Sequence, residues 1–459
     1  MNPSRRAFLA GTAALAALPF AGQTAEASIF DPWHKVPWLL ARIRPPRFPH
    51  RTFGITEFGA VDGGVTKNTE AFRRAITACH RAGGGRVVVP AGTFLTGPIE
   101  LLSNVELHLE AGATVTFSTE PADYLPVVQV RYEGTLCYNY RPFIHADGAC
   151  DIAITGQGTL DGRGPQGPWA SFGSNNADTA LLRKMGNDGV PVEQRVFGEG
   201  HKIRPSFIGL YHSRNILISG IEIKNPPMWS LHPVFCHNVT VENVTFRTTN
   251  SQGDGVDLDS TRYAHIVGCR MDTNDDCVVI KSGRDADGRR VGIPTRDVVV
   301  ERCKFSGRWG GVTVGSEMSG GAYDIFARDC EINAPDFPGR YPIKHALYVK
   351  TNTDRGGVID GIHLRNIHGT GVEREVLFVS MLYNGGGTAG VNPAIRNITV
   401  DGMKIDGGKI AASFTGLPDA HIGKVRVTNS TFTNIASPNA ITNTDDLTFR
   451  NSTINGQPV

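Results

Sequence analysis

The chain has 459 residues, a formal net charge of +2 from 46 basic and 44 acidic side chains, and 54 glycines. A charge so close to balance predicts no nucleic-acid partner and no strongly basic membrane-binding surface. Past the N-terminus no apolar run is long enough to cross a bilayer, so we expect no membrane span. The glycine content favours a turn-rich β protein over a helical one.

The first 27 residues have the pattern of an export signal. Arg5 and Arg6 precede an Ala-rich apolar run that ends near Phe20, and Ala25-Glu26-Ala27 offers a small-x-small cleavage site. Paired arginines followed by Phe-Leu resemble a twin-arginine signal, which exports folded proteins. We therefore expect a twin-arginine-type signal peptide over residues 1–27 and a mature protein that is periplasmic or extracellular.

An amphipathic helix is predicted near the start of the mature chain. It begins close to Thr69 and ends at the glycine run 83–85, which terminates a helix readily. Its small and apolar residues fall on one side: Ala71, Ala75, Ile76, Cys79 and Ala82. We expect this helix to cap one end of the repetitive structure that follows.

The rest of the chain carries a repeat. Windows of nine residues alternate polar and apolar side chains, as in residues 238–246 (NVTVENVTF). The windows begin near Asp151, Asn215, Asn238, Tyr263, Asp297, Asp324, Gly361, Asn397, Lys424 and Asp446. Alternation with period two predicts strands with one buried face, and a base spacing of 22 or 23 residues is typical of a coiled solenoid. Each window changes phase at a Gly, Asn or Arg, where we expect a turn between two strands.

These features predict an all-β, single-domain, right-handed parallel β-helix with an N-terminal capping helix. One coil of about 22 residues holds about three short strands and cannot bury its own apolar face, so successive coils stack. Leucine-rich and propeller arrays have signature residues that this sequence lacks. We assign residues 51–459 to this solenoid and 28–50 to a linker or N-terminal extension. Intervals between windows reach 37 residues, and such insertions tend to gather on the binding face.

Eight cysteines are spread along the chain without a CxxC pair or a metal-ligand spacing. Cys269, Cys303 and Cys330 occupy the same place in successive windows. We interpret them as buried thiols stacked inside the solenoid, and leave open one or two disulfides, which an exported protein can form. No metal ligand set and no cofactor are expected.

Residues 250–283 carry the densest cluster of candidate catalysts. Asp254 and Asp275 are 21 residues apart, almost one coil, so their carboxylates should lie on one face about 4.8 Å apart. Asp276 joins them only if 275 and 276 sit at a turn or bulge, because consecutive strand residues face opposite ways. Hydrolysis of a glycosidic bond needs one protonated carboxyl and one carboxylate close together on the same face. Crowding of like charges raises the pKa of one acid and keeps it protonated. Asp257 and Asp259 are either further acids of this site or turn-capping residues.

With these acids the chain resembles glycoside hydrolase family 28, the polygalacturonases and their relatives. The resemblance covers nearly the whole mature chain, including residues 158–162 (GTLDG), 204–208 (RPSFI) and 225–233 (NPPMWSLHP). The family's Asn-Thr-Asp motif falls on Gln252-Gly253-Asp254 and its Asp-Asp pair on Asp275-Asp276. The resemblance implies Asp275 as the general acid, Asp254 and Asp276 as the pair that holds the nucleophilic water, and inversion at the anomeric carbon.

Two departures from the family pattern bear on the substrate. The family's Gly-His-Gly motif falls on Trp309-Gly310-Gly311, without the histidine, and its Arg-Ile-Lys motif on Tyr348-Val349-Lys350, without the arginine. In the family the arginine and lysine hold the substrate's carboxylate and the histidine supports the site. Lys350 is kept, but the loss of the arginine and the histidine counts against endo-cleavage of homogalacturonan.

Six further residues are candidate ligands of an acidic sugar. Cations can pair with a uronate carboxylate, flat aromatic faces can support a pyranose ring, and a Pro-marked loop upstream of the acids can reach the same groove. The candidates are Lys350 and Lys281, Trp309 and Tyr348, and His232 and Trp229. His345 is a weaker substitute for the missing histidine. An insertion over residues 181–202 could close one end of the groove, which would make the enzyme exo-acting.

The sequence thus predicts a monomeric hydrolase of α-galacturonosidic linkages whose partner is a pectic polysaccharide or oligogalacturonide. It would be exo-acting or specific for rhamnogalacturonan or another decorated pectin. One alternative is a calcium-dependent pectate eliminase, because the fold is shared and the acids could bind Ca²⁺, although an eliminase also needs a strong base. A second is a pectin-binding solenoid that has lost activity, suggested by the missing arginine and histidine. Retention of all three acids favours the hydrolase.

Overall fold

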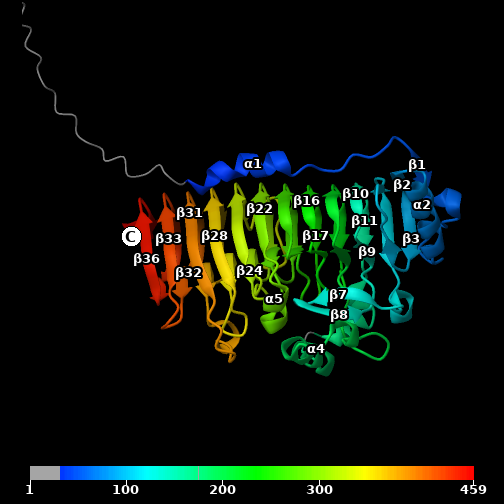
Figure 1. The fold of residues 1–459 in the computed structure, drawn as a ribbon. Helices are drawn as coiled ribbons and strands as arrows, with labels where there is room; N and C mark the ends of the chain where they lie inside the picture. Colours follow the sequence, from blue (N-terminus) through cyan, green and yellow to red (C-terminus); the bar gives the residue numbers. More distant parts are fainter. Residues whose placement is uncertain (1–30, 174) are drawn as a thin grey trace, which may run out of the picture.

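The computed structural model describes residues 31–173 and 175–459, so the predicted signal peptide lies outside the described residues. Strands stack coil upon coil into one long solenoid (Figure 1). Between the described strands every pairing is parallel except two, β7 with β8 and β37 with β38. The predicted parallel β-helix is confirmed. Within the described part of the chain no helix is long and apolar enough to cross a membrane.

One face of the solenoid is a 13-stranded parallel sheet to which each coil adds one strand. In order along the solenoid its strands are β1 (Thr52–Gly54), β2 (Gly85–Val89), β5 (Val105–Leu109), β10 (Cys150–Gly156), β13 (Arg214–Ser219), β16 (His237–Glu242), β19 (Arg262–Val267), β22 (Thr295–Glu301), β25 (Ala322–Arg328), β28 (Val358–Arg365), β31 (Ala394–Asp401), β33 (Ile422–Thr428) and β36 (Thr444–Arg450).

Each of the ten sequence windows forms one strand of this sheet. The first residue of each window lies in a β-bulge. These residues have a positive φ, from 51° at Asp446 to 87° at Gly361. The pairing passes over them: Cys150 pairs with Arg214 and Ile152 with Ile216, which leaves Asp151 and Asn215 unpaired. Side chains join the bulges between coils, since Asn215 Nδ2 donates to Asp151 Oδ1 at 3.0 Å. This explains why Asn and Asp are frequent at the bulged position, because these residues tolerate the left-handed region of φ and ψ.

Apart from β7 and β8, which pair only with each other, the other strands form two runs that share the long strand β32. We call the first the short-strand run: β3 (Gly92–Thr96), β6 (Ala113–Phe117), β11 (Thr159–Asp161), β14 (Glu222–Lys224), β17 (Thr245–Arg247), β20 (Arg270–Thr273), β23 (Lys304–Gly307), β26 (Glu331–Ile332), β29 (His368–Thr370), β32 (Lys404–Thr415), β34 (Thr431–Ser437), β37 (Thr453–Ile454) and β38 (Gln457–Pro458). The acid-bearing run consists of β4 (Ile99–Glu100), β9 (Ile144–Asp147), β12 (Ile208–Tyr211), β15 (Leu231–Val234), β18 (Val256–Asp259), β21 (Val278–Lys281), β24 (Gly310–Gly315), β27 (His345–Lys350), β30 (Glu375–Ser380) and β35 (Ala440–Thr442), with β32 between the last two.

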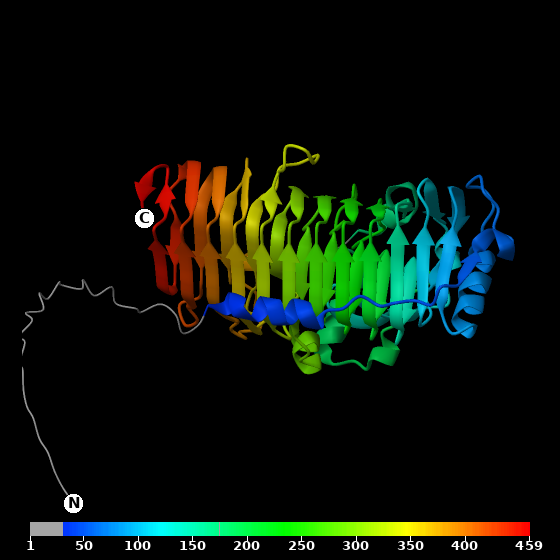
Figure 2. The same cartoon turned by 90° about the horizontal axis from the view of Figure 1, so that it is seen from above.

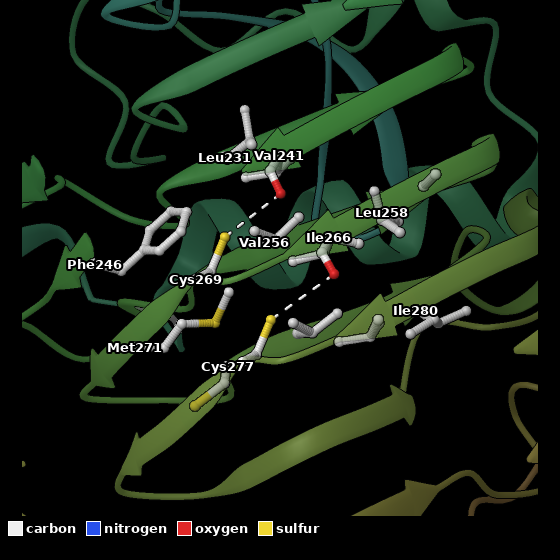
Figure 3. Packing of buried hydrophobic residues seen from close by; sticks show 14 of the residues in the cluster. Leu231, Val241, Phe246, Val256, Leu258, Ile266, Cys269, Met271, Cys277 and Ile280 are labelled. Carbon is white, nitrogen blue, oxygen red and sulfur yellow. Dashed lines mark hydrogen bonds between the residues drawn. The ribbon is translucent and has the colours of Figure 1, made fainter. Parts of the chain in front are cut away.

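Apolar side chains from all three faces fill the interior as one continuous core. Figure 3 shows Cys269 in this core beside Phe246 and Met271, with its Sγ 3.5 Å from the carbonyl oxygen of Val241. Cys303 and Cys330 are equally buried, and all eight cysteines are free. The interpretation as stacked buried thiols is confirmed, and the open possibility of disulfides is not realised.

Two helices cover the solenoid at its start and along its side. Helix α2 (Thr69–Arg81) caps the first coils and buries the predicted face together with Phe72, whereas Ala82 is exposed. Residues 28–50, expected as a linker or extension, contain η1 (Pro32–His34) and α1 (Lys35–Arg42). Helix α1 lies along the outside of the 13-stranded sheet (Figures 1 and 2), and its buried residues pack against Tyr263, Val299 and Phe326. Helix α1 is therefore packed against the solenoid.

Insertions between coils project from the side of the acid-bearing run. Figure 1 shows the hairpin of β7 (Val128–Tyr132) and β8 (Thr135–Asn139) and helices α4 (Ala177–Asp188) and α5 (Asp285–Val291) along this edge. The remaining short elements are η2 (Ile55–Phe58), η3 (Pro121–Tyr124), η4 (Gly164–Gln166), α3 (Trp169–Phe172), η5 (Val192–Gln194) and η6 (Tyr383–Gly385). Together with the acid-bearing run, the hairpin, α4, α5 and the η6 loop surround the candidate site.

Candidate active site

The three predicted acids meet at the point where the chain enters the acid-bearing run. Asp254 precedes β18, and Asp275 and Asp276 precede β21. One carboxylate oxygen from each lies within 4.8 Å of the others, and we call these residues the acidic trio. The register pairs Val256 with Val278, so the residue one coil above Asp254 is Asp276 rather than Asp275.

Local turn geometry explains how two consecutive aspartates serve one site. Residues 274–277 form a bend between β20 and β21, as the sequence required. The Thr273 hydroxyl donates to the Asp275 carbonyl at 2.8 Å, and the Asp276 N–H donates to Asp275 Oδ1 at 3.0 Å. Glycine is needed beside the trio because a Cβ at Gly255 would lie 2.4 Å from the carbonyl oxygen of Cys277. The backbones of the two coils therefore approach closely at this level.

Asp276 is the most firmly held member of the trio. Its Oδ1 accepts the Gly310 N–H at 2.7 Å, and its Oδ2 accepts from Lys350 Nζ at 2.7 Å. Asp276 is 1% exposed, so little water competes with these contacts. Asp254 is also buried, and its Oδ1 has no hydrogen-bond partner among the described residues.

Burial and mutual repulsion raise the pKa values of two of the acids. Burial, followed by the charge of Asp276, raises the pKa of Asp275 to about 6. Burial, followed by the charges of Asp257 and Asp275, raises the pKa of Asp254 well above its usual value. Because these groups interact strongly, the protons leave the cluster in shared steps rather than residue by residue. The site therefore offers a proton donor and an anchored carboxylate at the same pH.

The trio lies in a cavity of about 240 Å³. It is lined by Glu133, Asn175, Arg183, Trp229, Gln252, Asp254, Asp275, Asp276, Lys281, Arg284, Ser316, Glu317, Lys350, Arg355, Tyr383 and Asn384. The lining is strongly polar, with five basic and five acidic side chains. Such a space suits one small, polar, charged ligand better than an extended apolar one.

Six predicted site residues line this cavity: the trio, Lys281, Lys350 and Trp229. Lys281 Nζ lies 2.9 Å from Glu317 Oε2 and 4.5 Å from the centre of the Trp229 ring. Although burial opposes protonation, the Glu317 and Asp257 carboxylates raise the pKa of Lys281. Lys281 therefore stays charged inside the cavity.

The other three predicted ligands lie behind or beside the cavity. His232 is 0% exposed and does not line the cavity, and its Nδ1 lies 3.0 Å from the Ser206 hydroxyl. Tyr348 is 4% exposed and lies under Lys350 Nζ, 4.4 Å from its ring centre. Trp309 is half-buried and stacks parallel to Tyr348 at 6.2 Å. These aromatic rings support the lysines rather than line the cavity.

The weaker histidine candidate, His345, is also buried. Its Nδ1 lies 2.8 Å from the Glu375 carbonyl oxygen, and burial lowers its pKa to about 4. It stacks on Tyr348 with ring centres 4.4 Å apart. His345 is thus a neutral packing residue that stands two coils above Asp276, since Gly310 pairs with His345.

Most of the charged lining was not predicted. Glu133, at the turn of the hairpin, accepts from Arg183 at 2.5 Å and from Arg284 at 3.2 Å. Glu317 is contacted by Lys281, Arg284 and Arg355, and despite its burial these cations hold its pKa well below the usual value. Each of these cations therefore already has an acidic neighbour.

The long intervals between windows were the signal that could have located part of this lining. Arg284 falls in the interval of 34 residues that follows Tyr263, and Arg355 in the interval of 37 that follows Asp324. Tyr383 falls in the interval of 36 that follows Gly361. Insertions in consecutive coils project beside one another, so their residues converge.

Buried ion pairs fasten the hairpin and α4 over the site. Arg131 Nη1 lies 2.9 Å from Asp259 Oδ1, and both side chains are 0% exposed. Arg195 Nη1 lies 2.9 Å from Asp287 Oδ1, which joins the segment after α4 to α5. Asp259, left open by the sequence between a catalytic and a capping role, is therefore the anchor of the hairpin that carries Glu133.

The trio is compact enough to ligate a cation, which bears on the calcium alternative. Ca²⁺ takes six to eight oxygen ligands at about 2.3–2.6 Å. However, both oxygens of Asp276 are already engaged, one of them by the Lys350 ammonium. A second ammonium, Lys281, lies 3.8 Å from Asp257. Two cations so close to the acids disfavour a divalent ion in the same place.

Comparisons with known proteins agree with this geometry. The chain matches the family described as Glycosyl hydrolases family 28 over residues 79–413. It is 30% identical over 400 residues to a probable polygalacturonase of Vitis vinifera, covering 82% of this chain and 73% of the relative. It is 26% identical over 437 residues to an exo-poly-alpha-D-galacturonosidase of Dickeya chrysanthemi, covering 88% and 71%.

Among solved structures, a hyperthermoactive exopolygalacturonase from Thermotoga maritima superposes with a TM-score of 0.87 at 37% sequence identity. The match covers 92% of this chain and 96% of that one. With the family match spanning most of the solenoid and the acidic trio, the chain belongs to glycosyl hydrolase family 28.

Proposed function

We propose that this protein is an exo-acting polygalacturonase, which releases galacturonate units from the end of pectic chains by hydrolysing α-galacturonosidic bonds. The observation that carries the proposal is the acidic trio, with one oxygen of each acid within 4.8 Å, inside a cavity ringed by lysine and arginine. Relatives in the family with names of this kind, in Dickeya chrysanthemi and Thermotoga maritima, support the same substrate class.

In the proposed mechanism Asp275 is the general acid. It donates its proton to the glycosidic oxygen, which leaves as the hydroxyl of the remaining chain. A water molecule held by Asp254 and Asp276 attacks the anomeric carbon from the opposite face and gives up its proton to this carboxylate pair. A pKa of about 6 lets Asp275 stay largely protonated in mildly acidic solution.

We infer inversion of the anomeric carbon, although the trio is compact. Inverting enzymes usually hold their two carboxyl groups about 6.5–9.5 Å apart to admit a water. Here the base is divided between two acids, so that no single pair has to span the gap. The water would occupy the space between Asp254 and Asp276, and this leaves each of them a poor covalent nucleophile.

The charge of the cavity suits an acidic sugar. Five basic and five acidic side chains line it, and protonation of the general acid Asp275, whose pKa is about 6, removes one negative charge. The cavity is then positive, which attracts a uronate carboxylate. Lys350 and Lys281 are the cations nearest the trio, since Lys350 contacts Asp276 directly.

Exo-action follows from the enclosure of the trio by insertions. Glu133 from the hairpin, Asn175 and Arg183 from the segment of α4, and Tyr383 from η6 all line the same small cavity. An internal stretch of polymer would need an open groove on both sides of the trio. Enclosure therefore favours a chain end over an internal site of homogalacturonan or a decorated pectin.

One incubation separates this function from its two alternatives. With polygalacturonate, the hydrolase produces new reducing ends and releases galacturonate with or without a chelator. The calcium-dependent eliminase would instead produce unsaturated, ultraviolet-absorbing products that disappear with the chelator. The pectin-binding solenoid would produce neither. Unsaturated products, or no products, would overturn the proposal.

We also propose that the protein is exported through a twin-arginine signal and acts as a monomer outside the cytoplasm. The support for export is the arginine pair and the cleavage site in the first 27 residues. A polymeric pectic substrate is too large to enter a cell intact, which is consistent with this location.

A further inference from the structure

Lys344 is a half-buried lysine beside the acidic trio that has no acidic partner among the described residues. Its Nζ lies 3.7 Å from the centre of the Trp309 ring, and no carboxylate approaches it to ion-pair distance. The cations of the cavity differ, because Lys281, Arg284, Lys350 and Arg355 are each within 4.0 Å of a carboxylate oxygen. A positive charge held over a ring without an anion is available to a ligand.

Charged groups of both signs surround Lys344 beyond ion-pair distance. Burial lowers its pKa, Glu373 opposes the change, and Arg308 and Arg374 add to it. Arg308 and Arg374 are exposed, and Arg374 pairs with Glu375 at 3.4 Å. An incoming carboxylate would supply the ion-pair partner that Lys344 lacks, and it would favour the charged form of the lysine.

Backbone contacts connect Lys344 to the trio. The carbonyl oxygen of Trp309 accepts the N–H groups of Lys344 at 2.9 Å and of His345 at 3.2 Å. The residue after Trp309, Gly310, donates its N–H to Asp276 Oδ1 at 2.7 Å. Lys344 is also near enough to Asp275 for the two charges to interact. Lys344 therefore stands close to the trio, although it does not line the cavity.

This position corresponds to the leaving-group side of the bond, if the proposed function holds. The cavity receives the terminal sugar, and Asp275 protonates the oxygen that joins it to the rest of the chain. The rest of the chain must then lie on the far side of Asp275, outside the enclosed space. Lys344 and Trp309 fit this position, because Lys344 is close enough to Asp275 to interact with it and neither residue lines the cavity.

We propose that Lys344 binds the free carboxylate of the uronate on the leaving-group side, and that Trp309 is a positioning residue that holds the lysine side chain through its ring. The ligand class is an unesterified uronate in a 1,4-linked chain. This inference rests on the proposed function. In it, Lys344 and Trp309, which lie outside the cavity, determine the specificity for the leaving group.

The test compares two substrates that share the terminal galacturonate but differ in the leaving group. Trigalacturonate has a uronate leaving group, whereas p-nitrophenyl α-galacturonide has a neutral aromatic one. For Lys344→Gln we expect KM for trigalacturonate to rise at least ~10-fold, the equivalent of about 1.4 kcal/mol, with kcat within about twofold. Hydrolysis of the nitrophenyl substrate should stay at the parental rate.

Three further comparisons sharpen the result. Lys344→Arg keeps the charge and should retain most of the parental KM. Lys404→Gln removes an exposed lysine of β32 and is the matched control, with parental kinetics expected. The parent should prefer trigalacturonate over its methyl ester, and Lys344→Gln should lose most of that preference.

An unchanged KM for trigalacturonate in a folded Lys344→Gln protein would overturn the inference. Equal losses on both substrates would also overturn it, because they would indicate damage to the cavity. If the parent hydrolyses neither substrate, the proposed function itself has failed, and the inference fails with it. A parent that is active on both, with the variant indistinguishable from it, refutes only the role of Lys344.

Discussion

Replacing Lys350 with methionine perturbs the ion pair that anchors Asp276. The two side chains are 9% and 1% exposed and their charged atoms are 2.7 Å apart. Removing one partner of a buried pair costs about 3–5 kcal/mol, because the other charge stays buried. Methionine preserves much of the contact with Tyr348, so we expect a loss of about 3 kcal/mol in unfolding free energy.

The same substitution should change the pH dependence in a defined direction. Burial, followed by Asp276, raises the pKa of Asp275 to about 6, whereas Lys350 lowers it. Asp275 acts as an acid only while protonated, so kcat/KM falls as the pH rises through its pKa. Without Lys350 this pKa is higher, so the basic limb of the profile should move to higher pH by about one unit.

Two assays check these expectations. Denaturant unfolding of Lys350→Met, of Asp276→Asn and of the double variant measures the pairing, and the double variant should lose much less than the sum of the single ones. The profile of kcat/KM between about pH 4 and 9 measures the shift, with Lys404→Met as the control. Additive losses would refute the buried pair. A basic limb that stays in place or moves to lower pH would refute Asp275 as the acid that Lys350 influences.

Each single Asp→Asn change in the acidic trio should leave a folded protein with kcat lowered by at least ~10²-fold, and near-parental turnover in any one variant removes that residue from the mechanism. Nuclear magnetic resonance in the first minutes of hydrolysis should show a β-anomer released from an α-linked substrate; an initial α-anomer would contradict the three-acid scheme. Arg131→Met breaks a fully buried ion pair with the solenoid, so the hairpin should loosen and longer oligogalacturonides should appear beside galacturonate. Products identical to those of the parent would show that the hairpin does not enclose the site. Replacing Arg5 and Arg6 with lysine should stop export, and the exported parent should begin near Ser28; sequencing that finds Met1 on exported protein would count against the signal.

The strands of the 13-stranded sheet could be predicted from the sequence because each coil repeats the same physical requirement. One face is buried in every coil, so apolar residues alternate, and the bulge at the start of each window requires a positive φ, which Asn and Asp tolerate. The acidic trio could be predicted for a related reason. Asp275 and Asp276 follow Asp254 by 21 and 22 residues, which is about one coil. Because successive coils stack, residues one coil apart in sequence lie close together in space.

The residues of the insertions that enclose the acidic trio could not be predicted from the repeat. Glu133 and Tyr383 are far apart in sequence and belong to insertions that follow no repeat, yet they line one cavity. Their approach depends on where each insertion folds back and on ion pairs such as Arg131 with Asp259, which join side chains 128 residues apart. No local pattern encodes such contacts.

The direction of each side chain decides which of the predicted substrate-binding residues line the cavity. The chemistry of His232, Tyr348 and Trp309 and their nearness to the acids in sequence predict substrate contacts, but all three lie outside the cavity. Lys281 and Lys350 lie inside it, because they end their strands at the level where the insertions begin. The sequence by itself determined the solenoid, the capping helix and the level of the acids, since these follow from periodicities of two residues and of one coil. Only the tertiary structure decided which side chains enclose the site and which cation is left without a partner, because those depend on packing between segments that the repeat does not relate.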